Sequence, residues 1–178
     1  GVVAQLSNID YWELEELFEH IDATGENAFL VYLDNVTDVR NLGAIARSAE
    51  CAGANGLIIP QQGSAPINQD AIKTSAGALL RLPVCKINNI KTFINTIKAH
   101  DVRIYSASEK ANVLYTQMKA TEPLMLVMGS EENGVSPTMI KMSDELVKIP
   151  LKGEIESLNV SAAASVLLFE IVRQRLGI

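Results

Sequence analysis

The sequence predicts an α/β fold in which a mostly parallel sheet carries helices on both faces. Six short apolar runs, typical of buried strands, alternate with stretches of helical length and spacing. The 178 residues, 48% of them hydrophobic, suffice for one compact domain with a real core. No apolar run approaches the length of a membrane span, so we expect no membrane insertion. In such folds ligands bind at the carboxyl ends of the strands.

The predicted elements follow one another along the chain. Asp10 to Ile21 is expected to be an amphipathic helix that opens with a capping box between Asp10 and Glu13. Strands are expected at residues 29–33, 56–59, 84–87, 102–105, 124–128 and 146–149. Helices are expected at residues 42–52, 69–79, 90–99, 137–142 and 160–173. We therefore predict an N-terminal linker segment with a helix at residues 1–24 and the main domain at residues 25–178.

Charge and cysteine content limit the kinds of site. The chain has 15 Lys and Arg against 21 Asp and Glu, a net charge of -6. Any contact with RNA must then be a local patch, or be supplied by a missing segment. Cys51 and Cys85 form no CxxC or Cys/His cluster, which predicts ordinary thiols in a reducing cytoplasm. His20 and His100 stand alone, so we expect no metal site.

The last forty residues suggest a ligand-binding loop. Pro150 ends the strand at Ile149, because proline has no N–H for a sheet ladder. A loop follows, and both Ser157 and Asn159 are able to cap the next helix. That helix is apolar almost all round, so it needs a second packing partner besides its own sheet. We expect a rigid loop, pinned between a strand and a buried helix, that holds a ligand.

Two further segments follow predicted strands. In the first, Asn41 is expected to cap a helix of small residues in which Arg47 is the one large charge. The alternative is a surface arginine on a tightly packed helix. The second is the Gly-rich turn after Met128, which lacks the signatures of a P-loop and of a dinucleotide fold. A plain turn between strand and helix is the alternative there.

Three ordered motifs carry a family resemblance over roughly Ala28 to Arg175. They are Asn41-x-Gly43-Ala44-x-x-Arg47-Ser48-Ala49, Gly129-Ser130-Glu131-x-x-Gly134, and Ile149-Pro150 followed by Ser157-Leu158-Asn159-Val160-Ser161. Together they resemble the SpoU (TrmH-like) branch of the SPOUT RNA methyltransferases. The chain is also similar to the subgroup that methylates a guanosine ribose in large-subunit ribosomal RNA. Gly1-Val2-Val3-Ala4 resembles the junction after that subgroup's N-terminal RNA-binding domain, which would make residues 25–178 the catalytic domain.

The resemblance implies a C-terminal trefoil knot that holds S-adenosylmethionine. It assigns the cofactor contacts to Gly129, Ile149 and Leu158, with the neighbours Met128, Pro150 and Asn159. It also implies a catalytic Arg47, supported by the other polar motif positions Asn41, Glu131, Ser157 and Asn159. An arginine stays charged at neutral pH, so we expect it to stabilise the forming alkoxide and not to act as a general base. Glu131 is expected to orient Arg47 or to accept the proton.

Competing interpretations concern substrate and activity. A tRNA could replace rRNA as the substrate, and the chain could be a non-catalytic RNA-binding module or a doubly wound nucleotide-binding domain. We also expect a homodimer through the outward side of the helix at residues 160–172. Leu168 is predicted to lie on that outward side. Ser161 and Ser165 are predicted to let another helix approach closely.

Overall fold

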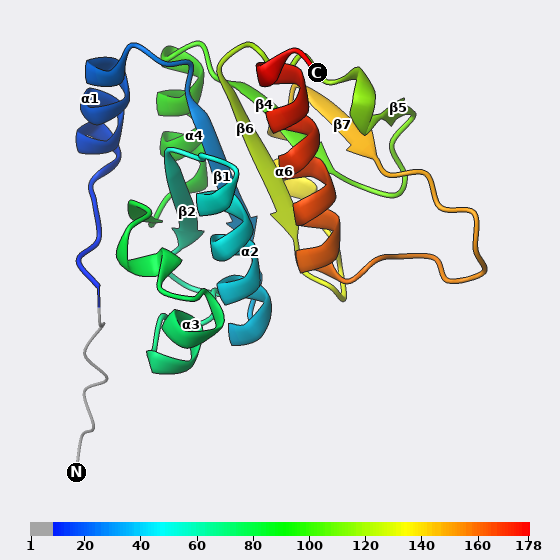
Figure 1. Ribbon diagram of the computed structural model, residues 1–178, viewed down its shortest axis with the longest axis horizontal. Helices are drawn as coiled ribbons and strands as arrows, with labels where there is room; N and C mark the ends of the chain where they lie inside the picture. Colours follow the sequence, from blue (N-terminus) through cyan, green and yellow to red (C-terminus); the bar gives the residue numbers. More distant parts are fainter. Residues whose placement is uncertain (1–8) are drawn as a thin grey trace.

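A seven-stranded sheet forms the centre of the molecule (Figure 1). The computed structural model describes residues 9–178, so the expectation for residues 1–4 lies outside them. The strand order is β3-β2-β1-β6-β4-β7-β5, and every pair of neighbouring strands is parallel. The strands are β1 (Phe29–Asp34), β2 (Gly56–Pro60), β3 (Val84–Ile87), β4 (Arg103–Ala107), β5 (Val113–Leu114), β6 (Leu124–Gly129) and β7 (Glu145–Lys148).

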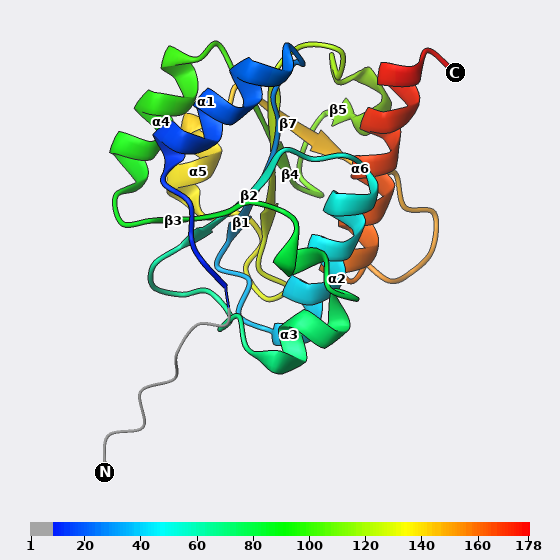
Figure 2. The same cartoon turned by 60° about the vertical axis from the view of Figure 1, so that its left-hand side comes forward.

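Helices cover both faces of the sheet (Figure 2). The helices are α1 (Leu14–Thr24), α2 (Val39–Cys51), α3 (Gln69–Thr74), α4 (Ile90–Ala99), α5 (Pro137–Met142) and α6 (Val160–Leu176), with 3-10 turns η1 (Ala78–Leu80) and η2 (Tyr115–Gln117). One core cluster joins the sheet to α2 and α6, and a second joins it to α1 and α4. The predicted fold class is therefore confirmed. All six predicted strands are present, and only the two-residue β5, too short for a pattern, was not anticipated.

The start of α1 differs from the prediction. The helix begins at Leu14, and its N-cap Glu13 forms no side-chain capping bond, so the predicted capping box is wrong. The preceding residues stay extended because Trp12 forms a parallel bridge with Cys85, and its N–H donates to the Val84 carbonyl at 2.9 Å. Leu17 and Phe18 are buried in the same core cluster as β1. The helix thus packs as part of the main domain.

Two other helix ends were also predicted wrongly. Asn41 does not cap α2; the N-cap is Asp38, whose carboxylate accepts from the Asn41 N–H at 2.9 Å. The helix expected over residues 69–79 breaks after Thr74 into α3 and η1. Ala76 and Gly77 have φ of 52° and 84°, and this left-handed backbone cannot continue a helix.

Helix α6 is packed on one side and exposed on the other. Asn159 is its N-cap, as predicted, accepting from the N–H groups of Ser161 and Ala162. Leu168 is fully buried, so its predicted outward position is wrong. The exposed positions are Ala162, Val166, Phe169, Arg173 and Leu176, at helical spacing. Ser165 does allow a close helix approach, but the neighbour is α2 of the same chain, through a 2.8 Å Ser48–Ser165 hydroxyl contact.

The end of α6 is anchored by Arg175 to the amino edge of the sheet. Its guanidinium donates to the carbonyls of Asn27, Ala28 and Ala120 and lies over the Phe29 ring at 5.0 Å. Burial lowers the pKa of this guanidinium, with Glu26 acting in the opposite direction. This anchor places the first turn of α6 at the opposite, carboxyl edge. No helix in residues 9–178 is long and apolar enough to cross a membrane.

Candidate functional site

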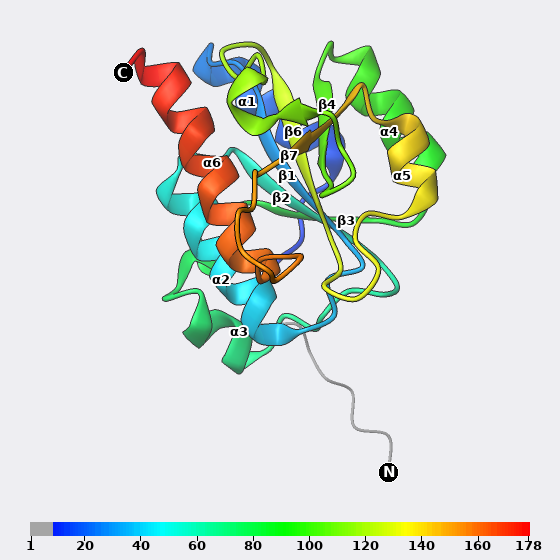
Figure 3. The same ribbon diagram turned by 90° about the vertical axis from the view of Figure 1, so that its right-hand side faces the viewer.

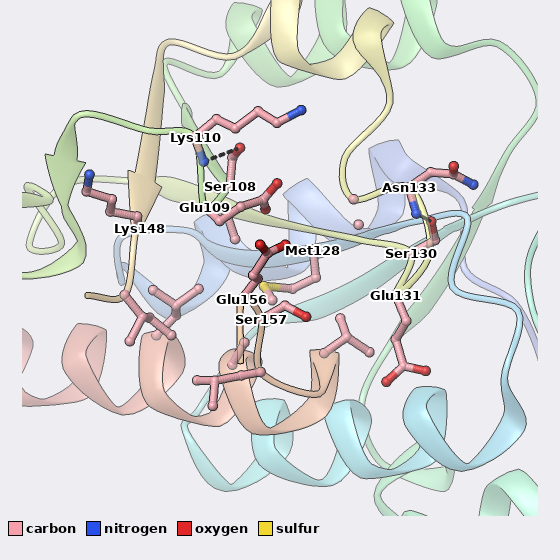
Figure 4. Close-up of a pocket in the computed structure, with 18 of the residues that line it drawn as sticks. Ser108, Glu109, Lys110, Met128, Ser130, Glu131, Asn133, Lys148, Glu156 and Ser157 are labelled. Atoms are coloured by element: carbon pink, nitrogen blue, oxygen red, sulfur yellow. Dashed lines mark hydrogen bonds between the residues drawn. The ribbon is translucent and has the colours of Figure 1, made fainter. Parts of the chain in front are cut away.

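A cavity of about 540 Å³ opens at the carboxyl ends of β6, β4 and β7 (Figure 4). These strands lie next to one another in the sheet, and β6 separates β4 from β1. The chain proceeds from β1 to β2 and β3 on one side and returns through β4 on the other, so the strand order reverses here. Ligands of open α/β sheets bind at such a reversal. The N-terminal half of α6 closes the cavity through Val160, Ala163 and Leu167.

Most of the predicted cofactor residues line this cavity. Met128, Gly129, Ile149 and Leu158 are all in its wall, whereas Pro150 and Asn159 are not. Ser157 and Glu131, predicted as catalytic, also line it. The wall thus combines apolar side chains with a few polar groups, as small-molecule sites usually do.

A second cavity of about 330 Å³ adjoins the first. The two share Val160 and the turn at residues 130–133, and Asn35 to Asp38 and Asn41 complete the second wall. The turn at residues 130–133 is thus a partition between the two cavities. It carries Glu131 and separates Asn41 from the first cavity. Such an arrangement can hold two molecules side by side with Glu131 reaching toward both.

Asn159 connects the three motifs through its side chain. Its amide nitrogen donates to the Asn41 side-chain oxygen at 3.0 Å and to the Glu131 carboxylate at 2.5 Å. Its oxygen accepts from Ser161 and Ala162 at the start of α6. Both amide hydrogens are thereby committed. Asn159 therefore acts on Asn41 and Glu131, fixing their side chains at the partition between the cavities.

The turn that carries Glu131 is folded tightly back on itself. Ser130 and Gly134 exchange two backbone hydrogen bonds, of 2.9 and 3.1 Å. Gly134 adopts φ of +67°, which favours glycine. A Cβ built on Gly129 would lie 2.1 Å from the Gly134 carbonyl carbon, so no other residue fits there. The glycines of this motif therefore shape the turn.

Arg47 stands apart from this cluster. It is exposed and lines neither cavity, and its side chain forms no hydrogen bond or ion pair within residues 9–178. It lies six residues after Asn41, about 9 Å further along α2 at roughly 1.5 Å per residue. Glu131 contacts Asn159 and makes no ion pair with Arg47. Within residues 9–178 the Arg47 side chain therefore makes no hydrogen bond or ion pair with the other predicted catalytic residues.

The charge around the cavities is predominantly negative. Glu109, Glu131, Glu132 and Glu156 line the first cavity, against Lys110 and Lys148. Figure 4 shows Glu109 and Glu156 directed into the cavity and toward each other. The second cavity has Asp38, Glu131 and Glu132 and no Lys or Arg in its wall. In strand β1, burial and then the charge of Asp34 raise the pKa of the Tyr32 phenol. The first cavity suits a cationic molecule.

The loop between β7 and α6 is exposed along its length. Every residue from 150 to 159 is exposed, although both ends of the loop are anchored, by buried Val147 and Val160. Figure 3 shows the loop running alongside the first turns of α6. Loop residues 151–159 have no buried apolar anchor of their own. The loop is therefore held at its two ends, between β7 and α6, and the expectation that it is rigid and holds a ligand stays a prediction.

Sequence reasoning missed the segment from Ala107 to Lys110. It forms one wall of the first cavity because it follows β4, which neighbours both β6 and β7. Glu156 and Lys148 were missed as well. The available signal was position, because a ligand at strand ends contacts the loop after every neighbouring strand. Among the described residues no group of His, Cys, Asp and Glu side chains is placed to hold a metal ion.

The geometry agrees with the proteins that this chain resembles. The model of the family described as "SpoU rRNA Methylase family" matches residues 28–169. The 23S rRNA (guanosine-2'-O-)-methyltransferase RlmB of Xylella fastidiosa is 41% identical over 175 residues, covering 98% of this chain and 70% of that protein. An uncharacterized tRNA/rRNA methyltransferase of Synechocystis is 39% identical over 98% of this chain. The chain spans 46% of the Synechocystis protein's length.

A solved structure shows the same architecture. It is the SpoU methyltransferase AviRb from Streptomyces viridochromogenes in complex with the cofactor AdoMet. The two superpose with a TM-score of 0.81 at 29% identity, covering 86% of this chain and 62% of the other.

Proposed function

Because the chain belongs to the SpoU rRNA methylase family, we propose that it methylates a ribose 2′-hydroxyl of ribosomal RNA with S-adenosylmethionine. The observation that carries this proposal is the Asn159 bridge, which unites the three motifs at the partition between two adjoining cavities. The first cavity suits the methyl donor and the second the ribose. The trefoil knot implied by the family stays a prediction.

The residues of the first cavity fit S-adenosylmethionine. Met128, Ile149 and Leu158 supply an apolar slot, and the backbone around Gly129 supplies donors and acceptors for an adenine edge. Glu109 and Glu156 supply negative charge for a cationic ligand. The bound cofactor would supply an electrophilic methyl group. The chain's own contribution is to hold that group beside the second cavity.

Methyl transfer requires the acceptor oxygen to lie in line with the bond that breaks. Fixed placement of two reactants contributes about 7–11 kcal/mol to lowering such barriers. Glu131, held by Asn159, faces both cavities and is placed to hydrogen-bond the hydroxyl and accept its proton. A cation near the oxygen would stabilise the developing negative charge. The second cavity has no cation of its own, which leaves that role to Arg47.

We also propose that the active form is a two-fold homodimer. The outward stripe of α6 includes Val166, Phe169 and Leu176, with exposed fractions of 39%, 49% and 65%. A soluble protein seldom leaves such an apolar stripe uncovered, and two-fold pairing is the commonest way to cover it. Helix α6 packs against α2, whose Arg47 side chain has no partner within residues 9–178. A partner subunit's α2 would then bring an arginine to a site that lacks one.

Transfer of labelled methyl groups from S-adenosylmethionine tests the proposed activity. The purified chain is incubated with a large-subunit ribosomal RNA transcript and, separately, with bulk tRNA, and the modified nucleotide is mapped. We expect a 2′-O-methylated nucleotide in the ribosomal transcript. Preferential labelling of tRNA would reassign the substrate. Calorimetric binding of the cofactor without transfer to either RNA would support the non-catalytic alternative.

A further inference from the structure

Asp34 is a buried acid that the three motifs do not include. Asp34 ends β1 and is 4% exposed. It lies beside Gly129 in the sheet register, directly behind the partition between the two cavities. It lines neither cavity itself. Any effect of Asp34 on the reaction must therefore pass through its neighbours.

The Asp34 carboxylate holds both loops that form the second cavity. One oxygen accepts from the backbone N–H of Ser136 at 2.6 Å, at the end of the turn that carries Glu131. The other accepts from the Asn35 side chain at 3.1 Å. Asn35 adopts φ of 60° and lines the second cavity. One side chain thus ties the loop after β1 to the turn after β6.

The contacts of Asp34 are unusual for a residue that serves stability alone. No Lys, Arg or His lies within ion-pair distance of it among the described residues. Burying a carboxylate without a cation is unfavourable, and here only two hydrogen bonds offset that cost. Bonds from N–H groups to a charged acceptor are short and directional. The gain from this arrangement is accurate placement of the two loops.

The turn that carries Glu131 is then held at two points. Asn159 holds the Glu131 carboxylate, and Asp34 holds the backbone at Ser136. We infer, on the basis of the proposed function, that Asp34 is a positioning residue: it holds Glu131 in place next to the methyl acceptor. Asp34 affects the binding site of the methyl acceptor and not that of the cofactor, because the loops that it joins form the second cavity.

Asp34→Asn tests this inference with little change of volume. An amide replaces one acceptor oxygen with a donor, so only one of the two contacts survives. We expect kcat to fall about tenfold while cofactor affinity stays within threefold. In a Glu131→Gln background the same substitution should have less than a twofold effect, because the group it positions has already been altered. If Asp34→Asn lowered kcat by the same factor in the unaltered chain and in the Glu131→Gln background, the inference would be overturned.

Asp144 provides a matched control. Its carboxylate also accepts from a backbone N–H, that of Ile104 at 2.8 Å, but this contact holds neither of the loops that form the second cavity. Asp144→Asn should leave kcat unchanged. If Asp34→Asn and Asp144→Asn lowered kcat to the same extent and lost the same thermal stability, the role of Asp34 would be structural only.

Amide hydrogen exchange separates this inference from the proposed activity. Asp34→Asn, and more strongly Asp34→Ala, should speed exchange at residues 130–136 and leave the α4 amides unchanged. Faster exchange in that turn with no methyl transfer by the unaltered chain would leave the positioning role standing and refute the proposed function. Unchanged exchange would refute the positioning role, whatever the activity.

Discussion

Asn159 donates a hydrogen bond to Glu131 across 2.5 Å, although the two residues are 28 positions apart in the chain. The contact joins the cap of α6 to the turn after β6. The same amide reaches Asn41 on α2. Three segments that are separate in sequence are therefore held together by one side chain.

Asn159→Asp separates capping from bridging. Aspartate caps helices as well as asparagine does, so the α6 cap should be retained and Tm should change little. The new carboxylate cannot donate and repels Glu131, so methyl transfer should fall at least about tenfold. A thermal melt and a single-turnover transfer assay measure the two effects. Ser161→Ala is the control, since it removes only a hydroxyl contact to the Asn159 oxygen. Normal turnover by Asn159→Asp would show that the bridge is dispensable.

Mixing two impaired variants tests whether Arg47 acts across a dimer. We expect Arg47→Ala and Glu131→Gln each to retain only a small but measurable fraction of normal activity alone. After joint refolding, half of the dimers are mixed, and each of these has one intact site of its two. Mixed dimers isolated by two affinity tags should therefore regain about half of the normal activity per dimer. Mixed dimers that stay impaired would place Arg47 and Glu131 of the same chain in one site.

Substitutions at two adjacent residues distinguish the faces of α6. Phe169 is 49% exposed, and Phe169→Glu should yield a folded monomer because it places a charge in the proposed interface. Leu168 is fully buried, and Leu168→Ala should instead cost about 2–5 kcal/mol of stability. Light scattering at micromolar concentration and denaturant titration report the two outcomes. A Phe169→Glu variant that remains a dimer would exclude this face as the interface.

The two cysteines should differ in reactivity. Burial, and then the nearby charges of Glu13, Glu16 and Glu15, raise the pKa of the Cys85 thiol to about 12. At pH 8 this thiol is therefore protonated and unreactive, whereas Cys51 is exposed. A chromogenic disulfide reagent at pH 8 should titrate one thiol per native chain and two in denaturant. With Cys51→Ser, no thiol should react before unfolding; rapid reaction would mean that the region around Cys85 opens.

The order of strands and helices could be read from the sequence because alternation of apolar runs records burial directly. Helix ends were predicted less well, since they depend on contacts between distant segments. Trp12 stays extended through its bridge to Cys85, and nothing local signals that pairing. Likewise Asn41 was assigned as a cap by type, while Asp38 accepts the bond from its N–H.

The functional site also combines features that could be predicted from the sequence with features that depend on contacts between distant segments. Residue type and strand position were enough to predict the parallel fold, and four of the six predicted cofactor residues do line the first cavity. The tertiary structure alone revealed that Asn159 bridges Asn41 and Glu131, and that Asp34 ties two loops together. It also decided that Leu168 packs inward while Phe169 faces outward. A helix that is apolar all round carries no periodic signal for its buried side, so the choice rests on the packing of α6 against α2.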